Sequence, residues 1–134
     1  MNRTKIMDIE DNEDIDFEYP EYEKVKDLVI EHLVKKGVQK VVVEFSGGGD
    51  EGSVNLVTVY FSDEDRIEID EADCKNLYNA LCSPVYFEFE SFAMDGHAEG
   101  AVTWHIDSSD VAKCKVLLTG QQSYKHWEDL DKEM

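Results

Sequence analysis

The chain has 134 residues, with 31 acidic against 13 basic side chains and a formal net charge of −18. This charge argues against direct binding to nucleic acid or to an anionic membrane, and favours a basic partner, metal cations or solubility alone. The length fits one domain and the 42% hydrophobic content can form a core, so we expect one folded domain over residues 19–134.

Residues 1–18 are predicted to form an acidic N-terminal arm. A block of like charges usually stays solvated, which favours a flexible arm, whereas the alternative is that Ile9, Ile15 and Phe17 attach part of it to the domain. The start of the chain has no apolar stretch typical of a signal peptide, and no segment approaches the roughly 20 apolar residues of a membrane span. We therefore expect a cytoplasmic protein. The cysteines Cys74, Cys82 and Cys114 form no CxxC pair and are predicted to be reduced and near the core.

The first half of the domain is predicted to be a helix followed by three strands. The helix should run from Pro20 to Lys36, because proline suits a first helical turn and Gly37 suits a stop. Two β-rich arms, Val38–Phe45 and Ser53–Phe61, then flank a glycine-rich acidic loop, as in a hairpin. Strict alternation over Arg66–Ile69 predicts a short third strand.

The second half is predicted to be a helix and three more strands. The helix should begin near Asp70, which is a good N-cap, and end at Pro84, because proline disfavours helix in the residue before it. Alternating residues predict strands over Val85–Phe92, Ala101–Asp107 and Lys113–Thr119. The polar segment 121–134 is expected to form a short helix or to fray.

The expected order is therefore α-β-β-β-α-β-β-β. Short turns between consecutive strands favour a mainly antiparallel sheet of about five to six strands. Two helices cannot cover both faces of such a sheet, so we expect an α+β two-layer sandwich with both helices on one face.

Two acidic glycine loops carry the chemistry that the sequence offers. Their glycines are predicted to have a structural role, since four of them lie between Gly47 and Gly52. Their carboxylates and one histidine are ligand types that divalent cations accept. The structural glycines would be Gly47, Gly49, Gly52, Gly96 and Gly100, and the metal ligands Asp50, Asp95, His97 and Glu99.

Both loops also carry a family resemblance. The first matches at Gly37, Val41, Val43, Glu44, Phe45, Gly47, Gly49, Asp50 and Gly52, and the second at Asp95, Gly96, Ala98 and Gly100. This pattern resembles a bacterial and phage family of small proteins of unknown function, with a Gly-x-Gly-Asp-Ser-Gly hairpin and an Asn/Asp-Gly-Ala-x-Gly loop. The match covers roughly residues 25–120, but Glu51 replaces the usual serine and the tryptophan-rich lead-in to the second loop is absent. The resemblance implies an origin in a phage or mobile element and supplies no activity or catalytic residues.

The sequence favours a non-enzymatic binding protein, because the motifs of nucleotide, serine-nucleophile and zinc-protease sites are absent. It would occupy a basic surface of a host protein, such as a nucleic-acid-binding groove, and act as a DNA mimic or anti-defence inhibitor. The alternatives are a metal-binding module or metal-dependent enzyme with a divalent cation, and a structural or regulatory interaction domain. The residues predicted to bind the partner are Asp11, Glu13, Asp14, Asp16, Asp50 and Glu51.

Overall fold

The computed structural model describes residues 8–49, 51–89, 94–123 and 127–134. The predicted order of helices and strands is roughly matched, with one short 3-10 helix added and two differences in the second half that are described below. The elements are α1 (Tyr22–Lys35), β1 (Lys40–Gly49), β2 (Glu51–Tyr60), β3 (Arg66–Ile69), α2 (Lys75–Phe89), β4 (Met94–His105), η3 (Val111–Lys113), β5 (Lys115–Ser123) and β6 (Trp127–Glu133).

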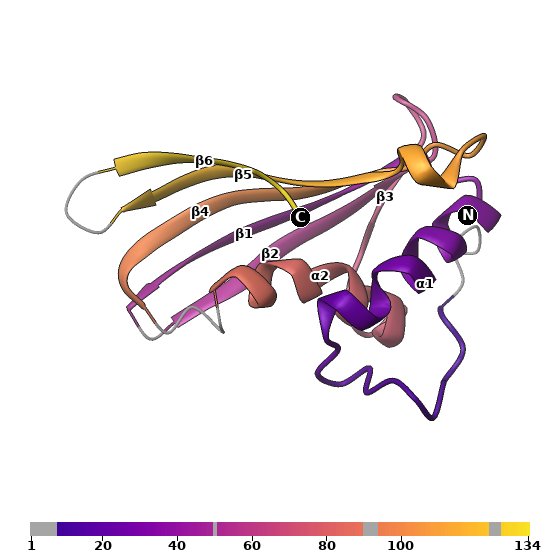
Figure 1. Ribbon diagram of the computed structural model, residues 1–134, viewed down its shortest axis with the longest axis horizontal. Coiled ribbons are helices and arrows are strands. Elements are labelled where there is room, and N and C mark those ends of the chain that lie inside the picture. Colours follow the sequence, from indigo (N-terminus) through magenta and orange to yellow (C-terminus); the bar gives the residue numbers. More distant parts are fainter. Residues whose placement is uncertain (1–7, 50, 90–93, 124–126) are drawn as a thin grey trace.

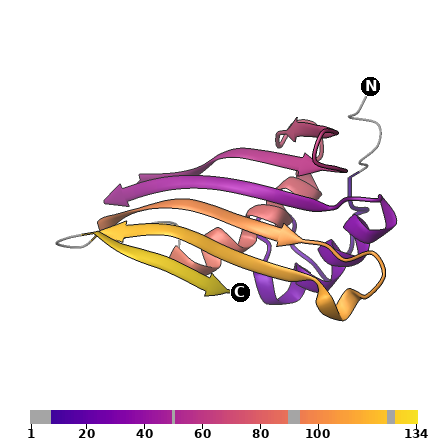
Figure 2. The ribbon, with the colours of Figure 1, turned by 90° about the horizontal axis from the view of Figure 1, so that it is seen from above.

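The strands form one six-stranded antiparallel sheet in the order β3-β2-β1-β4-β5-β6. Figure 2 shows the strands of the first half on one side of the sheet and those of the second half on the other. Each half is a helix followed by three strands, and the halves meet where β1 pairs with β4. The connectivity therefore repeats, although no repeat is evident in the sequence.

Both helices lie on the same side of the sheet, as predicted (Figure 1). The alternation of the strands places Val41, Val43, Val57, Val59 and Trp104 in the core between the two layers. The Trp104 indole nitrogen donates a hydrogen bond to the Leu81 carbonyl of α2 at 3.2 Å, which joins the centre of the sheet to a helix. The α+β architecture is thus confirmed.

Helix α1 follows its prediction closely. Val25, Val29 and Leu33 are fully buried at four-residue spacing, and Gly37 adopts a φ of 72° just beyond the helix. This is the left-handed conformation that favours glycine after a helix C-terminus.

The prediction that Pro84 ends the second helix is wrong, because α2 continues through it to Phe89. Proline removes the N–H that would bond to the carbonyl four residues earlier, which belongs to Ala80. The Ser83 hydroxyl donates to this carbonyl at 2.6 Å instead, so the acceptor stays satisfied. The predicted strand 85–92 is accordingly helical over Val85–Phe89, where Val85 is fully buried. Tertiary burial here overrides an alternation of aromatic residues typical of a strand.

The end of the chain also differs from its prediction. The third strand of the second half is β6, within the segment expected to be a short helix or frayed. Its backbone pairs with β5 from Ser123↔Trp127 to Leu117↔Glu133. β6 is an edge strand of the sheet, and charged side chains on an edge strand discourage pairing with another chain, so a polar sequence is compatible with this position.

Residues 8–18 pack on the folded domain, which is the alternative to a flexible arm. Ile9 and Phe17 are each only 6% exposed. The segment crosses the side of the helices that faces away from the sheet (Figure 1). Asn76 of α2 donates to the Ile9 carbonyl at 2.8 Å, and Asn79 donates to the Phe17 carbonyl at 2.9 Å. Two buried apolar side chains and two amide anchors outweigh the like-charge repulsion that suggested disorder.

Neither helix in the described part of the chain has the length and the apolar composition that a membrane span requires.

Candidate partner-binding surface

The acidic segment, residues 8–23, carries nine carboxylates and no basic side chain. Within the described residues, its carboxylates from Asp8 to Glu18 form no ion pair. Glu21 pairs with Lys24 at 3.3 Å, but both side chains are well exposed. This segment is therefore a strongly negative strip with little internal neutralisation.

Part of this charge has a structural role. The Asp8 carboxylate accepts hydrogen bonds from the backbone N–H groups of Asn76 at 3.2 Å and Leu77 at 2.7 Å. These are N–H groups of the first turn of α2, which lack partners inside the helix. Asp8 thus caps α2 from a distant segment and places its charge at the positive end of the helix dipole.

The residues predicted to bind a partner divide into two groups. The Asp11 carboxylate accepts a hydrogen bond from the Asn76 side-chain amide at 2.8 Å. The Asp16 carboxylate accepts hydrogen bonds from the backbone N–H groups of Glu18 at 3.0 Å and Tyr19 at 3.3 Å. Asp11 and Asp16 are nevertheless exposed residues. Glu13 and Asp14 are exposed and no such bond to their carboxylates is present in the described part of the chain. Asp50 lies outside the described residues, and Glu51 begins β2.

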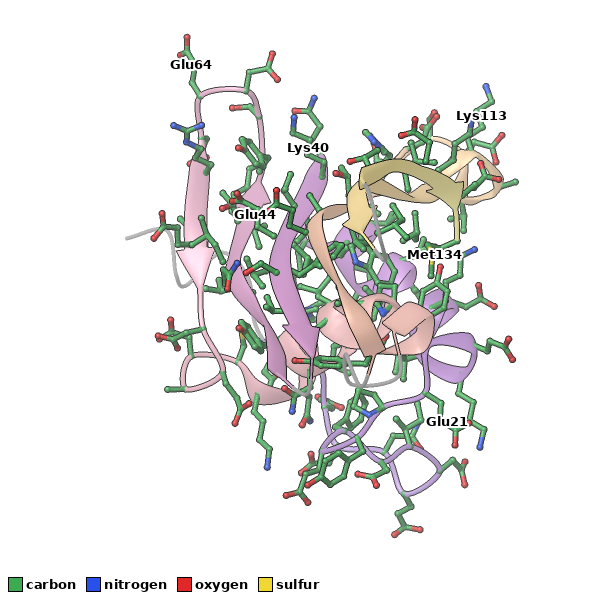
Figure 3. All side chains as sticks on the ribbon, turned by 90° about the vertical axis from the view of Figure 1, so that its left-hand side faces the viewer. Glu21, Lys40, Glu44, Glu64, Lys113 and Met134 are labelled. Atoms are coloured by element: carbon green, nitrogen blue, oxygen red, sulfur yellow. The ribbon has the colours of Figure 1, made fainter. Side chains whose placement is uncertain are left out.

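The remaining charge is spread over the molecule. Figure 3 shows Glu21 and Glu64 at opposite ends and Glu44 on the sheet between them. Among the side chains that the structure describes, the carboxylates do not gather on one face (Figure 3), so the acidic segment is distinguished by nine carboxylates without a basic residue between them.

A groove of about 580 Å³ lies beside the acidic segment. Helix α2 supplies one wall with Tyr78, Cys82 and Tyr86, which are spaced four residues apart and so share one helix face. We call this site the tyrosine groove; its lining is Glu18, Tyr19, Pro20, Val54, Glu71, Tyr78, Asn79, Cys82, Ser83 and Tyr86. Tyr19 is 78% exposed and Tyr86 is 40% exposed, so two aromatic side chains are accessible to a partner.

The interior of the groove is neutral and its negative charge lies at Glu18 and Glu71, which are both exposed. Burial raises the pKa of Cys82 to about 12, despite a hydrogen bond from Tyr78 that lowers it. Burial likewise raises the pKa of Tyr78 to about 12 and also raises that of Tyr86. Thiol and phenols are therefore protonated at neutral pH, and no lysine or arginine is among the described residues that line the groove.

Sequence reasoning missed this groove because it divided its helical wall. The four-residue spacing of Tyr78, Cys82 and Tyr86 is visible in the sequence. Ending the helix at Pro84 assigned Tyr86 to a strand, and the common face was lost. The second wall, which contains Glu18 and Tyr19, was assigned to the flexible arm and its boundary.

The two acidic glycine segments meet at one end of the sheet, but they are strands rather than loops. Gly47 and Gly49 lie in β1, Gly52 in β2, and Gly96 and Gly100 in β4. The predicted hairpin, formed by β1 and β2, is confirmed. Gly48 of β1 pairs with Glu51 of β2 on one side and with His97 of β4 on the other. Glu51 and His97 are thus separated by two strand spacings, roughly 10 Å.

The metal prediction rests on Asp50, Asp95, His97 and Glu99. Asp50 lies outside the described residues, while Asp95, His97 and Glu99 occupy β4. Among the side chains that the structure describes, no group of three or more histidine, cysteine, aspartate or glutamate residues could hold a metal ion. A divalent cation at these strand ends stays a prediction, and calorimetric titration with calcium, magnesium, manganese and zinc tests it.

Comparisons with protein-family models, with curated proteins and with solved structures found no significant match to this chain. The resemblance to the phage and bacterial family stays a prediction.

Proposed function

We propose that this chain is a non-enzymatic acidic binding protein that occupies a basic surface of a host protein. The observation that carries the proposal is the state of the acidic segment: it is fixed to α2, yet Glu10, Glu13 and Asp14 remain exposed. A strip held in place before binding loses little conformational entropy on association, so its charge can contribute to affinity.

The charge also selects the partner. Carboxylates on an exposed strip attract a positive surface over about one Debye length and repel nucleic acid and anionic membranes. A protein that binds DNA or RNA through lysine and arginine offers such a surface, and occupying it would block its ligand. An inhibitory role of this kind, in a phage or mobile element, is the specific form that the proposal takes.

The test uses a charge-neutralised variant and a matched control. E10Q/E13Q/D14N removes three charges from the acidic segment, whereas D63N/E64Q/E68Q removes three exposed charges at the β2–β3 turn and on β3. Each immobilised protein is incubated with bacterial lysate at about 50 mM and at about 500 mM salt; attraction between surface charges persists at the lower concentration and is largely screened at the higher one.

We expect the parent chain and the control to retain the same basic proteins at low salt and to release them at high salt. The E10Q/E13Q/D14N variant should lose them. Capture that is indifferent to salt, or an equal loss in both variants, would show that the acidic segment is not the binding surface. For any captured nucleic-acid-binding protein, the chain should compete with its DNA or RNA in a gel-shift assay.

A further inference from the structure

We infer that the tyrosine groove binds an arginine side chain of the basic partner, an inference that rests on the proposed function. The groove is next to the acidic segment and shares Glu18, Tyr19 and Pro20 with it. A partner seated on the segment would therefore present its own residues to the groove. About 580 Å³ is within the range of roughly 300–1,000 Å³ typical of pockets that hold small ligands.

The lining matches a cation in two ways. The faces of aromatic rings attract cations, and the groove contains Tyr19, Tyr78 and Tyr86. The carboxylates of Glu18 and Glu71 supply negative charge, and no lining cation competes for them in the described part of the chain. Elsewhere in this protein a tyrosine already has this role, since Lys40 Nζ lies 4.6 Å from the ring centroid of Tyr60 and Arg66 Cζ lies 5.7 Å from it.

Arginine fits this lining better than lysine. A guanidinium group is planar, stacks on aromatic rings and is more weakly hydrated than an ammonium group, so it loses less on entering a partly apolar groove. Its methylene stem can contact apolar atoms of Val54 and Cys82 in the lining. The protonated Cys82 thiol places no charge on the wall, so the carboxylates at Glu18 and Glu71 are the anionic partners of the guanidinium.

The experiment compares three capped octapeptides with alternating glycine and arginine, lysine or citrulline, by calorimetric titration of the full chain. Citrulline has nearly the shape of arginine without its charge. We expect the arginine peptide to bind more tightly than the lysine peptide and the citrulline peptide not to bind. Each aromatic ring removed should weaken arginine binding by about two- to fivefold and reduce the preference for arginine over lysine.

The first variant is Tyr19→Ala, which should not disturb the fold because the Tyr19 side chain is 78% exposed. The second variant, Tyr86→Leu, removes an aromatic ring from the helical wall of the groove. The control is Tyr60→Ala, which removes an aromatic ring on the sheet, outside the groove lining. Chemical-shift changes on peptide addition should concentrate at Asn79 and Ser83, which belong to that lining.

The results separate this inference from the proposed function. Equal binding of the arginine and lysine peptides, unchanged by Tyr19→Ala, overturns the inference while lysate capture by the acidic segment can still hold. Arginine binding that depends on Tyr19 supports the inference. If the E10Q/E13Q/D14N variant then captures the same basic proteins as the parent, the proposed role of the acidic segment is wrong, but arginine binding in the tyrosine groove is still supported.

Discussion

Gly100 of β4 and Gly120 of β5 face each other across the strand pair, with φ values of 157° and 150°. Their backbones approach so closely that a Cβ on Gly100 would lie 2.1 Å from the Thr119 carbonyl oxygen and 2.6 Å from the Gly120 Cα. A Cβ on Gly120 would meet the Glu99 carbonyl oxygen at 2.2 Å. Neither position has room for a side chain.

We therefore predict that Gly100→Ala lowers the free energy of unfolding by about 2–5 kcal/mol, because it adds steric overlap to an unfavourable backbone conformation. Urea unfolding of the purified variant measures this. Gly37→Ala is the control, since its φ is 72° but nothing lies within 4 Å of the added Cβ, and about 1 kcal/mol is expected. Equal losses in the two variants would contradict the close approach of the strands.

Asp8→Ala should destabilise the domain by about 1–2 kcal/mol, as loss of an N-cap typically does. The carboxylate bonds two N–H groups at the start of α2, at 3.2 and 2.7 Å, and both would lose their acceptor. Glu13→Ala removes a nearby exposed charge and should leave the urea midpoint unchanged or raise it slightly. If the two variants unfold at the same urea concentration, the acidic segment does not stabilise the helix.

Ser83 and Pro84 should be energetically coupled. Ser83→Ala removes the hydroxyl that bonds to the Ala80 carbonyl and should cost about 1 kcal/mol or more, since this acceptor is inside a helix. In a Pro84→Ala background the restored N–H can bond to the same carbonyl, so Ser83→Ala should cost less. A double-mutant cycle measured by urea unfolding gives the coupling, and additive losses would show that the hydroxyl does not replace the missing N–H.

Stability should fall as the pH rises above about 8.5. Burial raises the pKa values of Cys74 and Cys82 to about 12, whereas a thiol in the unfolded chain titrates near 8.5. Below that pH the two thiols are protonated in both the folded and the unfolded chain, so they do not lower the free energy of unfolding. Between about 8.5 and 12 the unfolded chain releases the protons that the folded chain keeps, so unfolding becomes easier.

Urea midpoints at pH 7.5, 9 and 10 measure this decline. The double variant Cys74→Ala/Cys82→Ala should be less stable than the parent at pH 7.5, because it creates cavities in the core, but its decline with pH should be shallower. A parallel decline in the parent and the variant would place the alkaline sensitivity in other groups. Tyr78, with its pKa raised to about 12, adds to the decline near and above pH 10, which is the midpoint at which free tyrosine titrates.

The sequence was most informative where one local rule acted alone. The four-residue apolar spacing of α1 and the left-handed Gly37 both follow from the pattern of residues. Pro84 was misjudged because the Ser83 hydroxyl and the burial of Val85 depend on the sheet that packs against the helix. The apolar residues Ile9 and Phe17 indicate that the acidic segment can attach to the domain, but not where, since their partners lie more than 60 residues away on α2. The tyrosine groove combines both of these features, so it required the structure.

The repeated connectivity has a kinetic consequence. Within each half, successive strands pair through short connections, whereas β1 and β4 pair residues 45 to 65 positions apart in the chain. Pairing β1 with β4, which we call the β1–β4 seam, requires α2 and its flanking loops to become ordered. Such non-local pairings slow folding. We expect the β1–β4 seam to form in the rate-limiting transition state, when the three strands of each half are already partly paired with one another. Core truncations such as Val43→Ala, at the seam, would then slow folding, whereas those in the outer strands would chiefly accelerate unfolding.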